Sequence, residues 1–457
     1  MEGKHWQTYP DEDFPTLRGQ FHCDVAIVGA GLTGVTLAWM LAKRGVSSVI
    51  LEADTPGCGS TTACTGKVTA QFEDAYVRTR TFYGKEIAAV FAERATRAVH
   101  HIGELAVSHP KLWCQSQHVY LSALQEDQVP ALEALYQLER GLGLHVQLEQ
   151  DHGDCPLPTF GSVRLEEQGL LSPMAWLYTL LHEAQGLGCR IFTHTPVQEV
   201  RPQLLITPKG ALHAQIIVLC TGVPIGLKRL PLLALMEQHT LVEVQLTNAP
   251  TFQHSYLECR EHGFTLRPLQ DGALMVRDLG RTGTIALQKE ANAFRQEIRR
   301  CFPDTSIQKI LHRQEVFSVD GLPLIGAIQP KDSHLLMASG YSGWGLVGSY
   351  MAAQLLSDNI LGTESAEGGL FLPSRTFPGK WRAMLQGSLP EAGAMLGSMI
   401  RPFAPKCPHM GCRLRYNTES EHWECPCHGS SFSFMGAPRY APAMHAAPIT
   451  SKQRKRE

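Results

Sequence analysis

The sequence predicts an α/β fold with a parallel sheet, a second, antiparallel sheet and a small separate domain at the C-terminal end. Three observations predict it. A strand, a glycine-rich turn, a helix and another strand follow one another within residues 22–52. Residues 232–290 alternate apolar and polar side chains, as antiparallel strands do. A Gly/Glu/Ser-rich stretch at 362–370 precedes a C-terminal segment rich in cysteine and histidine.

The first unit is an apolar strand over residues 22–28, a glycine-rich turn and a helix over 35–44. The turn reads Gly29-Ala30-Gly31-Leu32-Thr33-Gly34. Its glycines allow a tight turn, the approach of a pyrophosphate to the backbone and close helix–strand packing, and the helix N-terminus attracts that anion. A second strand, 48–51, ends at Glu52, where an acid binds ribose hydroxyls. The unit indicates a dinucleotide site but does not choose between FAD and NAD.

Further helices and strands are predicted along the rest of the chain. Residues 85–107 and 129–140 have helical apolar periodicity. Ser172 and Pro173 are an N-cap and a first helical position, which predicts a helix through residue 184. Strands are expected at 197–200, 204–207, 216–219, 241–246 and 264–269.

The C-terminal segment carries two mirrored Cys/His pairs, Cys-x-His and Cys-x-x-His, with fifteen residues between them. A Rieske-type [2Fe–2S] cluster needs this geometry, because two thiolates hold one iron and two imidazoles hold the other. Structural zinc is the alternative, although zinc fingers usually group Cys with Cys and His with His. The mixed pairs therefore favour the iron–sulfur cluster. Cys412 and Cys427 remain at matching offsets and could join the two loops as a disulfide.

Three further motifs lie between these ends, at residues 59–71, 318–326 and 338–346. Together with the glycine-rich turn they resemble the FAD-dependent oxidoreductases of the D-amino-acid oxidase and glycine oxidase superfamily. The wording of the C-terminal motifs, CPHMGC and CPCHGS, resembles the Rieske family, and the whole chain from about 20 to 445 resembles a bacterial branch that combines the two. Two positions depart from that branch: Phe72 replaces a histidine, and residues 276–283 replace a Gly-Gly-Glu-x-His-Lys-Thr-Gly segment.

The resemblance implies two cofactors, FAD and a [2Fe–2S] cluster, and the residues that hold them. The implied cluster ligands are Cys407, His409, Cys425 and His428, with Ser430 hydrogen-bonded to the cluster. The implied FAD-binding residues are Gly29, Ala30, Gly31, Leu32, Thr33, Gly34, Glu52, Ala53, Thr61, Thr62, Lys67, Val197, Thr221, Gly222, Gly340, Tyr341, Gly345 and Leu346. The helix that opens at 340–346 would direct its N–H groups at the flavin.

The same resemblance sets the expected domain boundaries. Residues 1–361 form the flavoprotein, with FAD-binding segments at about 20–75, 190–228 and 312–361 and a substrate domain at about 76–189 and 229–311. Residues 362–395 are a linker, and 396–457 are a truncated Rieske domain with little chain before the first ligand loop.

Composition limits the partners and the compartment. With 457 residues, 44% of them hydrophobic, the chain can bury a sizeable core, and its formal net charge of −2 gives no case for nucleic acid. The polar N-terminus and the lack of a long apolar stretch predict neither a leader nor a membrane span, so we expect the cytoplasm. Nine of the thirteen cysteines are scattered, as reduced thiols are.

We therefore expect an enzyme in which FAD oxidises a small amine or amino acid and the cluster passes electrons to an acceptor, such as a redox protein. Catalytic residues are not assigned; the candidates are Lys67 and Gln71 at the flavin edge, and Arg277 and Arg281 for a substrate carboxylate. Two alternatives remain. One is an oxygen-using amine oxidase with a structural metal tail, and the other is a non-catalytic electron-transfer or redox-sensing protein.

Overall fold

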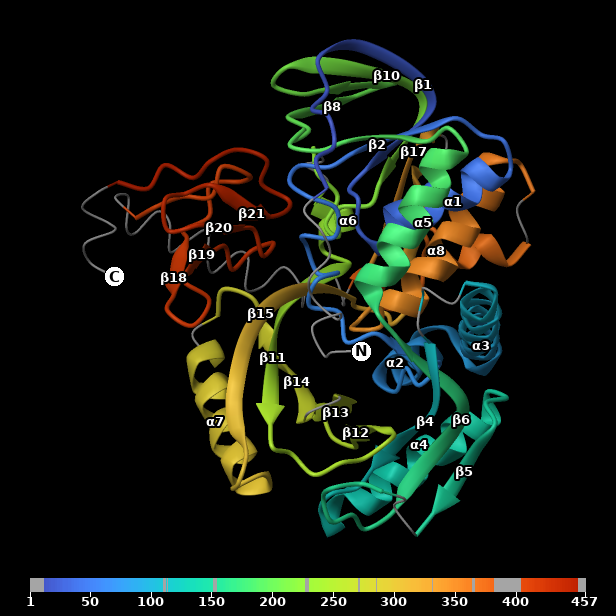
Figure 1. Cartoon of the computed structure of the whole chain (residues 1–457), viewed down its shortest axis with the longest axis vertical. Helices are drawn as coiled ribbons and strands as arrows, with labels where there is room; N and C mark the ends of the chain where they lie inside the picture. Colours follow the sequence, from blue (N-terminus) through green and yellow to red (C-terminus); the bar gives the residue numbers. More distant parts are fainter. Residues whose placement is uncertain are drawn as a thin grey trace.

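The computed structural model describes residues 12–109, 112, 114–150, 154–226, 230–269, 272–284, 286–330, 332–363, 366–381 and 404–450. Figure 1 shows three parts: a sheet covered by helices at the top, a large curved sheet below it, and a small C-terminal domain in red at the left. Among the described residues, no helix is long and apolar enough to span a bilayer.

The upper part is a parallel sheet built around the glycine-rich unit. Its strand order is β16 (Leu324–Gln329), β17 (Asp332–Ser339), β10 (Gly210–Leu219), β1 (Gly19–Val28), β2 (Ser48–Leu51) and β7 (Arg190–Phe192), and only β16 runs antiparallel to its neighbour. A hairpin of β8 (Glu199–Arg201) and β9 (Leu204–Ile206) pairs with β10. The end of β1 is buried on both faces, as strands inside parallel sheets are.

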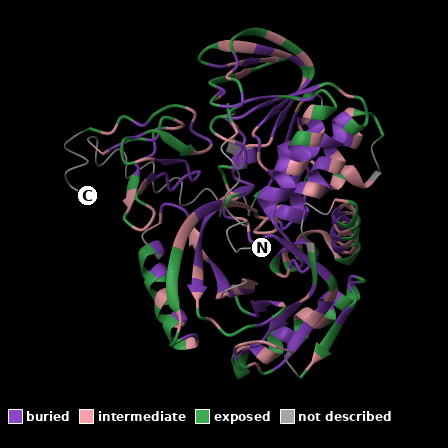
Figure 2. Ribbon diagram, in the orientation of Figure 1, coloured by how far each residue is buried: buried purple, intermediate pink, exposed green. Residues whose placement is uncertain are grey.

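Three helices cover one face of this sheet: α1 (Leu32–Lys43), α5 (Pro173–Gly186) and α8 (Gly345–Ile360). Ser172 caps α5 as predicted, because its Oγ accepts from the Ala175 amide at 3.3 Å. The burial colours of Figure 2 show the resulting continuous core, in purple, between helices and sheet.

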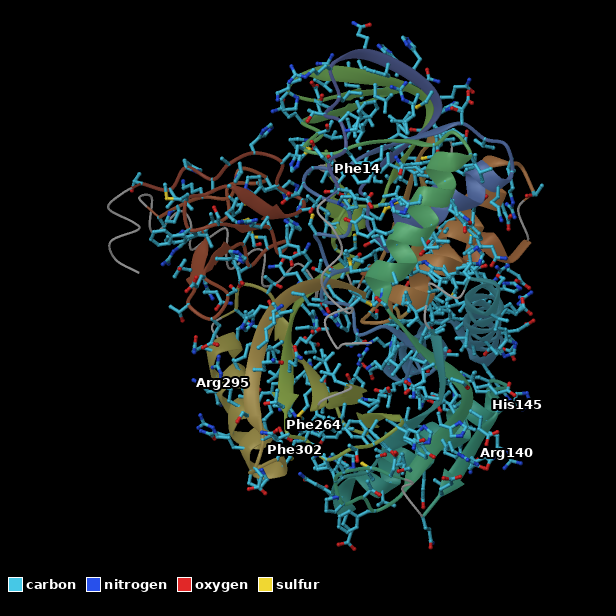
Figure 3. All side chains as sticks on the ribbon, in the orientation of Figure 1. Phe14, Arg140, His145, Phe264, Arg295 and Phe302 are labelled. Carbon is cyan, nitrogen blue, oxygen red and sulfur yellow. A yellow bond between two sulfur atoms is a disulfide. The ribbon has the colours of Figure 1, made fainter. Side chains whose placement is uncertain are left out.

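The lower part is a nine-stranded sheet. Its main path is β15 (Ser306–Ser318), β11 (Met236–Thr247), β14 (Gly272–Arg281), β13 (Phe264–Leu269), β12 (Ser255–Glu258), β4 (Cys114–Ser122), β6 (Ser162–Leu171) and β3 (Lys67–Val68), with β5 (Val146–Glu149) on β6. Neighbouring strands are antiparallel except β4 and β12. Helix α7 (Ala286–Cys301) packs against β14, and Phe264 of β13 and Phe302 after α7, both labelled in Figure 3, belong to the same hydrophobic cluster.

The remaining helices are α2 (Asp74–Tyr83), α3 (Lys85–Ser108), α4 (Val129–Gly141) and α6 (Leu230–Leu233), with 3₁₀ turns η2 (Glu126–Gln128) and η3 (Ala366–Phe371). Helix α3 packs against both α8 and the large sheet, and η3 packs on β16. The helices predicted at 85–107 and 129–140 are present as α3 and α4. The strand expected at 197–200 begins later, as β8, because the chain at Val197 turns inward instead.

The C-terminal domain is a four-stranded antiparallel sheet of β18 (Arg415–Asn417), β19 (His422–Glu424), β20 (Ser431–Phe432) and β21 (Pro438–Tyr440). Trp423 and Phe432 form its core together with cysteines of the two motifs. Glu419 forms an ion pair with Arg295, which Figure 3 labels on α7, so the domain is seated on the large sheet. Residues 391–399, whose sequence is typical of a helix, lie outside the described residues.

Candidate functional site

Two glycines of the turn after β1 have no space for a side chain. Gly29 has φ +105°, and a Cβ there would lie 2.6 Å from the Cys220 carbonyl oxygen. A Cβ on Gly34 would collide with the Gly29 carbonyl, because α1 starts directly against the turn. The resulting close approach leaves the N-terminus of α1 open toward a ligand, which is how helices bind a pyrophosphate.

Glu52 stands at the end of β2 beside this turn. Its Oε2 accepts from the Ala30 amide at 2.7 Å and its Oε1 from the Asp54 amide at 3.0 Å. The carboxyl is 9% exposed, and burial raises its pKa despite these amides, which lower it. Glu52 therefore holds the turn in place as well as facing the ligand space.

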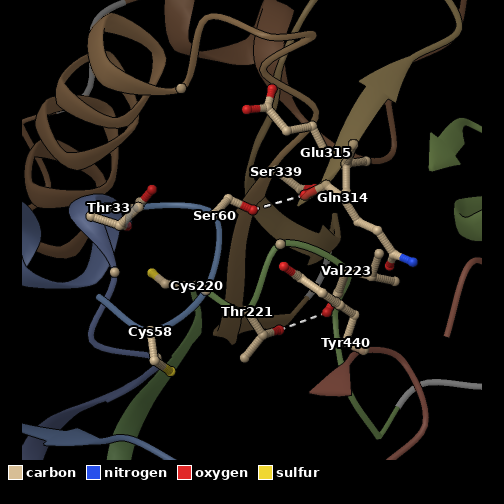
Figure 4. Close-up of a pocket in the computed structure, with 18 of the residues that line it drawn as sticks. Thr33, Cys58, Ser60, Cys220, Thr221, Val223, Gln314, Glu315, Ser339 and Tyr440 are labelled. Atoms are coloured by element: carbon tan, nitrogen blue, oxygen red, sulfur yellow. Dashed lines mark hydrogen bonds between the residues drawn. The ribbon is translucent and has the colours of Figure 1, made fainter. Parts of the chain in front are cut away.

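A cavity of about 750 Å³ runs from this turn to the start of α8. Figure 4 shows Thr33, Cys58 and Cys220 on one side of it and Val223, Gln314 and Tyr440 on the other. The sequence-predicted residues that line it are Gly29, Gly31, Leu32, Thr33, Glu52, Ala53, Thr61, Lys67, Val197, Thr221, Gly222, Gly340, Tyr341, Gly345 and Leu346. Ala30, Gly34 and Thr62 do not line it: the first two shape the turn, and Thr62 is exposed and bonds the Gly59 carbonyl.

The far end of the cavity is formed by the loop before α8. The Thr33 hydroxyl bonds the Tyr341 hydroxyl at 3.0 Å and that of Ser349 at 2.9 Å, which ties the glycine-rich turn to this loop. Trp344 lies against Phe72, with ring centroids 5.4 Å apart. The aromatic ring that replaces the family's histidine thus supports the cavity wall.

Lys67 is buried in the wall near this end, with Nζ 5.6 Å from the centre of the Trp344 ring. Burial lowers its pKa to about 7, and the nearby Arg313 guanidinium lowers it further, while Glu73 acts in the opposite direction. Arg313 also lines the cavity and pairs with Glu315 at 3.2 Å. The cavity therefore ends at two buried cations, one of which changes charge near neutral pH.

The other three catalytic candidates lie elsewhere. Gln71 donates to both carboxylate oxygens of Glu139, at 2.8 and 3.0 Å, and does not line the cavity. Arg277 points to the α7 side of the sheet, where it is 2.6 Å from Glu297 and lies over two phenylalanine rings. Its place in this buried ion pair separates it from the cavity, so it is a structural residue in this fold.

Arg281, at the end of β14, lies beside the C-terminal domain. Its guanidinium is 4.0 Å from Glu237, and its charge contributes to lowering the pKa of His428. It does not line the cavity either. The segment that departs from the family pattern thus contacts the second Cys/His loop.

A histidine network lies on the same sheet. His239 on β11 donates from Nδ1 to Asp278 at 2.7 Å, and Asp278 also bonds His262 at 3.1 Å. The His239 ring stacks on Phe317 with centroids 4.4 Å apart, and Nε2 is 3.7 Å from Glu237. Burial alone would lower the pKa of His239, but the hydrogen bonds to Asp278 and Glu237 outweigh it and raise the pKa to about 9.

The two Cys/His motifs form matched turns. In the first, the Cys407 amide donates to the Cys412 carbonyl and the Gly411 amide to the Cys407 carbonyl, both at 2.8 Å. The second repeats this at the same offsets, from Cys425 to Ser430 at 2.8 Å and from Gly429 to Cys425 at 2.9 Å. Gly411 and Gly429 both have positive φ, +79° and +70°, which these turns require.

The turns bring the expected ligands together in like pairs. The Cys407 and Cys425 side chains are hydrogen-bonded, and the His409 and His428 rings meet with centroids 5.1 Å apart. The Ser430 hydroxyl bonds the Cys407 thiol. A disulfide joins Cys412 and Cys427, as their offsets suggested, and its sulfurs lie within 4.8 Å of Cys425 Sγ.

The histidine edge of this site is enclosed. His428 is 8% exposed, and the Nε2 atoms of both histidines are buried. The second loop faces the large sheet, because Gly429 packs against Gln238 and Gly283 against Pro426.

Comparisons with known proteins agree with this geometry. Residues 24–359, which include the cavity and both large sheets, match the family described as FAD dependent oxidoreductase. The chain belongs to this family. Residues 390–451 match the Rieske [2Fe-2S] domain, so this FAD-dependent oxidoreductase carries an iron–sulfur centre at its C-terminal end.

Relatives share one or both parts. The Bacillus subtilis (strain 168) Rieske 2Fe-2S iron-sulfur protein YhfW is 25% identical, over 96% of each chain. Glycine oxidase of the same organism is 25% identical over 75% of this chain and 94% of its own. Among solved structures, glycine oxidase from Geobacillus kaustophilus has a TM-score of 0.64 at 20% identity, covering 78% of this chain and all of its own. L-proline dehydrogenase from P. horikoshii has a TM-score of 0.65 at 17% identity, covering 79% and 98%.

The residues present fit both cofactors of the family. The glycine cradle, the free N-terminus of α1 and the length of the cavity suit FAD, with Glu52 toward its ribose. Paired thiols and paired imidazoles on two matched turns suit a [2Fe–2S] cluster, whose irons take like ligands. Cys407, His409, Cys425 and His428 are the residues that would hold such a cluster.

Many residues that line the cavity are missing from the sequence-predicted set, among them Gln238, Arg313 and Tyr440. Gln238 is paired with Val316 and Arg313 with Leu241, so simple alternation along β11 and β15 does not place the first two on one face of the sheet. Tyr440 comes from the C-terminal domain, and no local pattern indicates which side of that domain docks.

Proposed function

We propose that this FAD-dependent oxidoreductase oxidises a small amine or amino acid and passes the electrons through its Rieske centre to an external acceptor such as a redox protein. Bound FAD supplies hydride acceptance from a C–H bond next to an amine, and the cluster carries one electron at a time.

One observation carries the electron route. Gln238 lines the FAD cavity, and its side chain also packs against Gly429 in the second cluster loop. A single residue therefore touches both cofactor sites. Because the FAD site and the cluster site are adjacent on one chain, electron transfer from FAD to the cluster is favoured over two independent redox reactions.

The substrate class is supported by the charges at the end of the cavity. Lys67 and Arg313 are buried cations there, and a guanidinium binds a carboxylate through two parallel hydrogen bonds. Glu315 pairs with Arg313 and holds its orientation. Relatives named for glycine, L-proline and L-amino acids share the fold. An amino acid with a free carboxylate therefore fits better than a simple amine.

The test is anaerobic mixing of the purified protein with a panel of amino acids. FAD bleaching is followed by absorbance and cluster reduction by low-temperature EPR, with iron and zinc measured on the same sample. We expect both centres to be reduced by one substrate, at about two irons per chain. The matched pair Cys425→Ser and Cys301→Ser, the latter on α7, separates loss of the cluster from loss of a cysteine.

Three outcomes contradict the proposal. An oxygen-using oxidase would be indicated if the substrate bleached FAD while the cluster stayed oxidised. In air, such an oxidase would form one mole of hydrogen peroxide for each mole of substrate consumed. Zinc in place of iron would remove the electron route. Reduction by a reductase but by no amino acid or amine would indicate a pure electron-transfer protein.

A further inference from the structure

The C-terminal domain forms one wall of the FAD cavity. His422 and residues 438–441, 443 and 444 line the same cavity as the glycine-rich turn. In Figure 4 the ribbon that carries Tyr440 lies across the cavity from Thr33 and Cys58. The FAD site of this chain is therefore completed by a domain that the family's FAD-binding region, residues 24–359, does not include.

Tyr440 is the central residue of this wall. It lines the cavity together with Gln314 of β15. The Gln314 carbonyl accepts from Ser60 Oγ at 2.8 Å, and Ser60 lies in the loop after β2 that also lines the cavity. The C-terminal domain, β15 and the FAD-binding loop thus meet at this cavity.

The same wall is tied to the second cluster loop. Ser430, the last residue of that loop, accepts through Oγ from the Ala443 amide at 3.1 Å. Ser431 pairs with Tyr440 between β20 and β21. From the other side, Gln238 donates to the Ala441 carbonyl at 3.2 Å while it packs against Gly429.

We propose that FAD and the iron–sulfur cluster bind cooperatively, because the cluster loop holds in place the Tyr440 wall that closes the FAD cavity. When the second cluster loop is ordered, it holds Tyr440, Ala441 and Ala443 in the positions in which they line the FAD cavity. Without the cluster, the loop keeps only its hydrogen bonds and the disulfide, and FAD must order the wall itself. By linkage, each cofactor raises the affinity for the other by the same factor. This inference needs only the two cofactors and does not rest on the proposed substrate or electron route.

The first experiment uses the full chain with three substitutions: Tyr440→Ala, Tyr440→Phe and, as a control, Phe434→Ala. Phe434 is an exposed ring of the same domain and does not line the cavity. FAD is removed and titrated back by flavin fluorescence, with iron counted in each sample. We expect Tyr440→Ala to raise the Kd for FAD roughly ten- to a hundredfold, since it removes a partly buried aromatic ring from the cavity wall. Tyr440→Phe should raise the Kd for FAD less than about tenfold, and Phe434→Ala should leave that Kd unchanged.

The second experiment compares wild-type protein with its cluster intact and after anaerobic removal of iron with bipyridyl. Cooperativity predicts a Kd for FAD that is about 5- to 150-fold higher without the cluster, and slower iron loss to the chelator when FAD is bound. Far-UV circular dichroism checks that the iron-free chain stays folded. Ser430→Ala, which cuts the bond to Ala443, should weaken FAD binding even at full iron content.

Equal FAD affinity in all these samples would overturn the cooperativity and leave the electron route untouched. Conversely, a substrate that reduces FAD and never the cluster would defeat the electron route, while a cluster-dependent Kd for FAD would still stand.

Discussion

Arg375 follows α8 in the stretch expected to be a linker, and it is instead buried in the FAD-binding part. Its guanidinium binds Asp320 through two hydrogen bonds, of 2.8 and 2.7 Å, and donates to the carbonyls of Leu322 and Pro323 at 2.6 and 2.9 Å. The two charged side chains are 4% and 1% exposed. Asp320 belongs to the 318–326 motif, so this pair fastens the returning chain to the sheet beside the FAD cavity.

Arg375→Ala should leave the Asp320 carboxylate buried without its counter-charge. Breaking a buried pair in this way costs about 3–5 kcal/mol. For a unit of about 340 residues, the unfolding entropy is about 0.7 kcal/mol/K, so the melting temperature should fall by roughly 4–7 °C. Replacing both partners, in Arg375→Met/Asp320→Ala, removes the unpaired charge and should recover a large part of the loss.

The assay is differential scanning calorimetry of the cofactor-loaded protein, at one scan rate because unfolding of a chain this size is rarely reversible. The control is Arg201→Ala, which breaks a fully exposed pair with Glu199 and should leave the melting temperature unchanged. A melting temperature for Arg375→Ala within about 1 °C of wild type, or a double variant less stable than the single one, would refute the reasoning.

Further predictions concern charge and the cluster loops. Because Lys67 loses its proton near pH 7, the KM for an anionic substrate should rise above that pH in wild type and stay flat in Lys67→Met, measured by steady-state kinetics. The Cys412–Cys427 disulfide closes a loop of sequence separation 15, worth about 3 kcal/mol, so Cys412→Ser/Cys427→Ser should lose the cluster's visible absorbance at lower temperature than wild type; equal temperatures would contradict this. His239 has its pKa raised to about 9 from 6.5, so its contribution to stability is complete below pH 6.5 and is lost as pH rises through 9. His239→Gln should therefore flatten the alkaline loss of stability in urea denaturation; an unchanged slope between pH 7 and 10 would sink the idea.

The parts of the molecule that local sequence determines were predictable. Gly29 has a positive φ and Gly34 has no space for a Cβ, and Cys407 and Cys425 begin turns whose offsets are visible in the chain. Each of these depends on neighbours within a few residues. The start of α5 followed from the same kind of local signal, whereas α1 begins at Leu32, three residues before its predicted start and inside the glycine-rich turn.

Positions that depend on register or docking were not predictable. Arg277 and Asp278 are adjacent on β14 and point to opposite faces of the sheet. The face that each residue takes determines its partner: Arg277 pairs with Glu297 on α7, and Asp278 bonds His239. Arg375 and Tyr440 act through partners more than fifty residues away or in another domain. No spacing in the sequence encodes those contacts.

The two close contacts of the second cluster loop limit how the C-terminal domain can move. A Cβ at Gly283 would lie 2.8 Å from the Pro426 backbone, and Gly429 is as tightly packed on Gln238. Swinging the domain away would also break the 3.1 Å bond from the Gly283 amide to the buried Glu424. A domain held at such short range needs no domain movement between FAD and the cluster, so electron transfer from reduced FAD to the cluster within one chain should not depend on solvent viscosity. A single-turnover rate of cluster reduction that fell in proportion to the viscosity of added glycerol would show that the domain moves away from the large sheet.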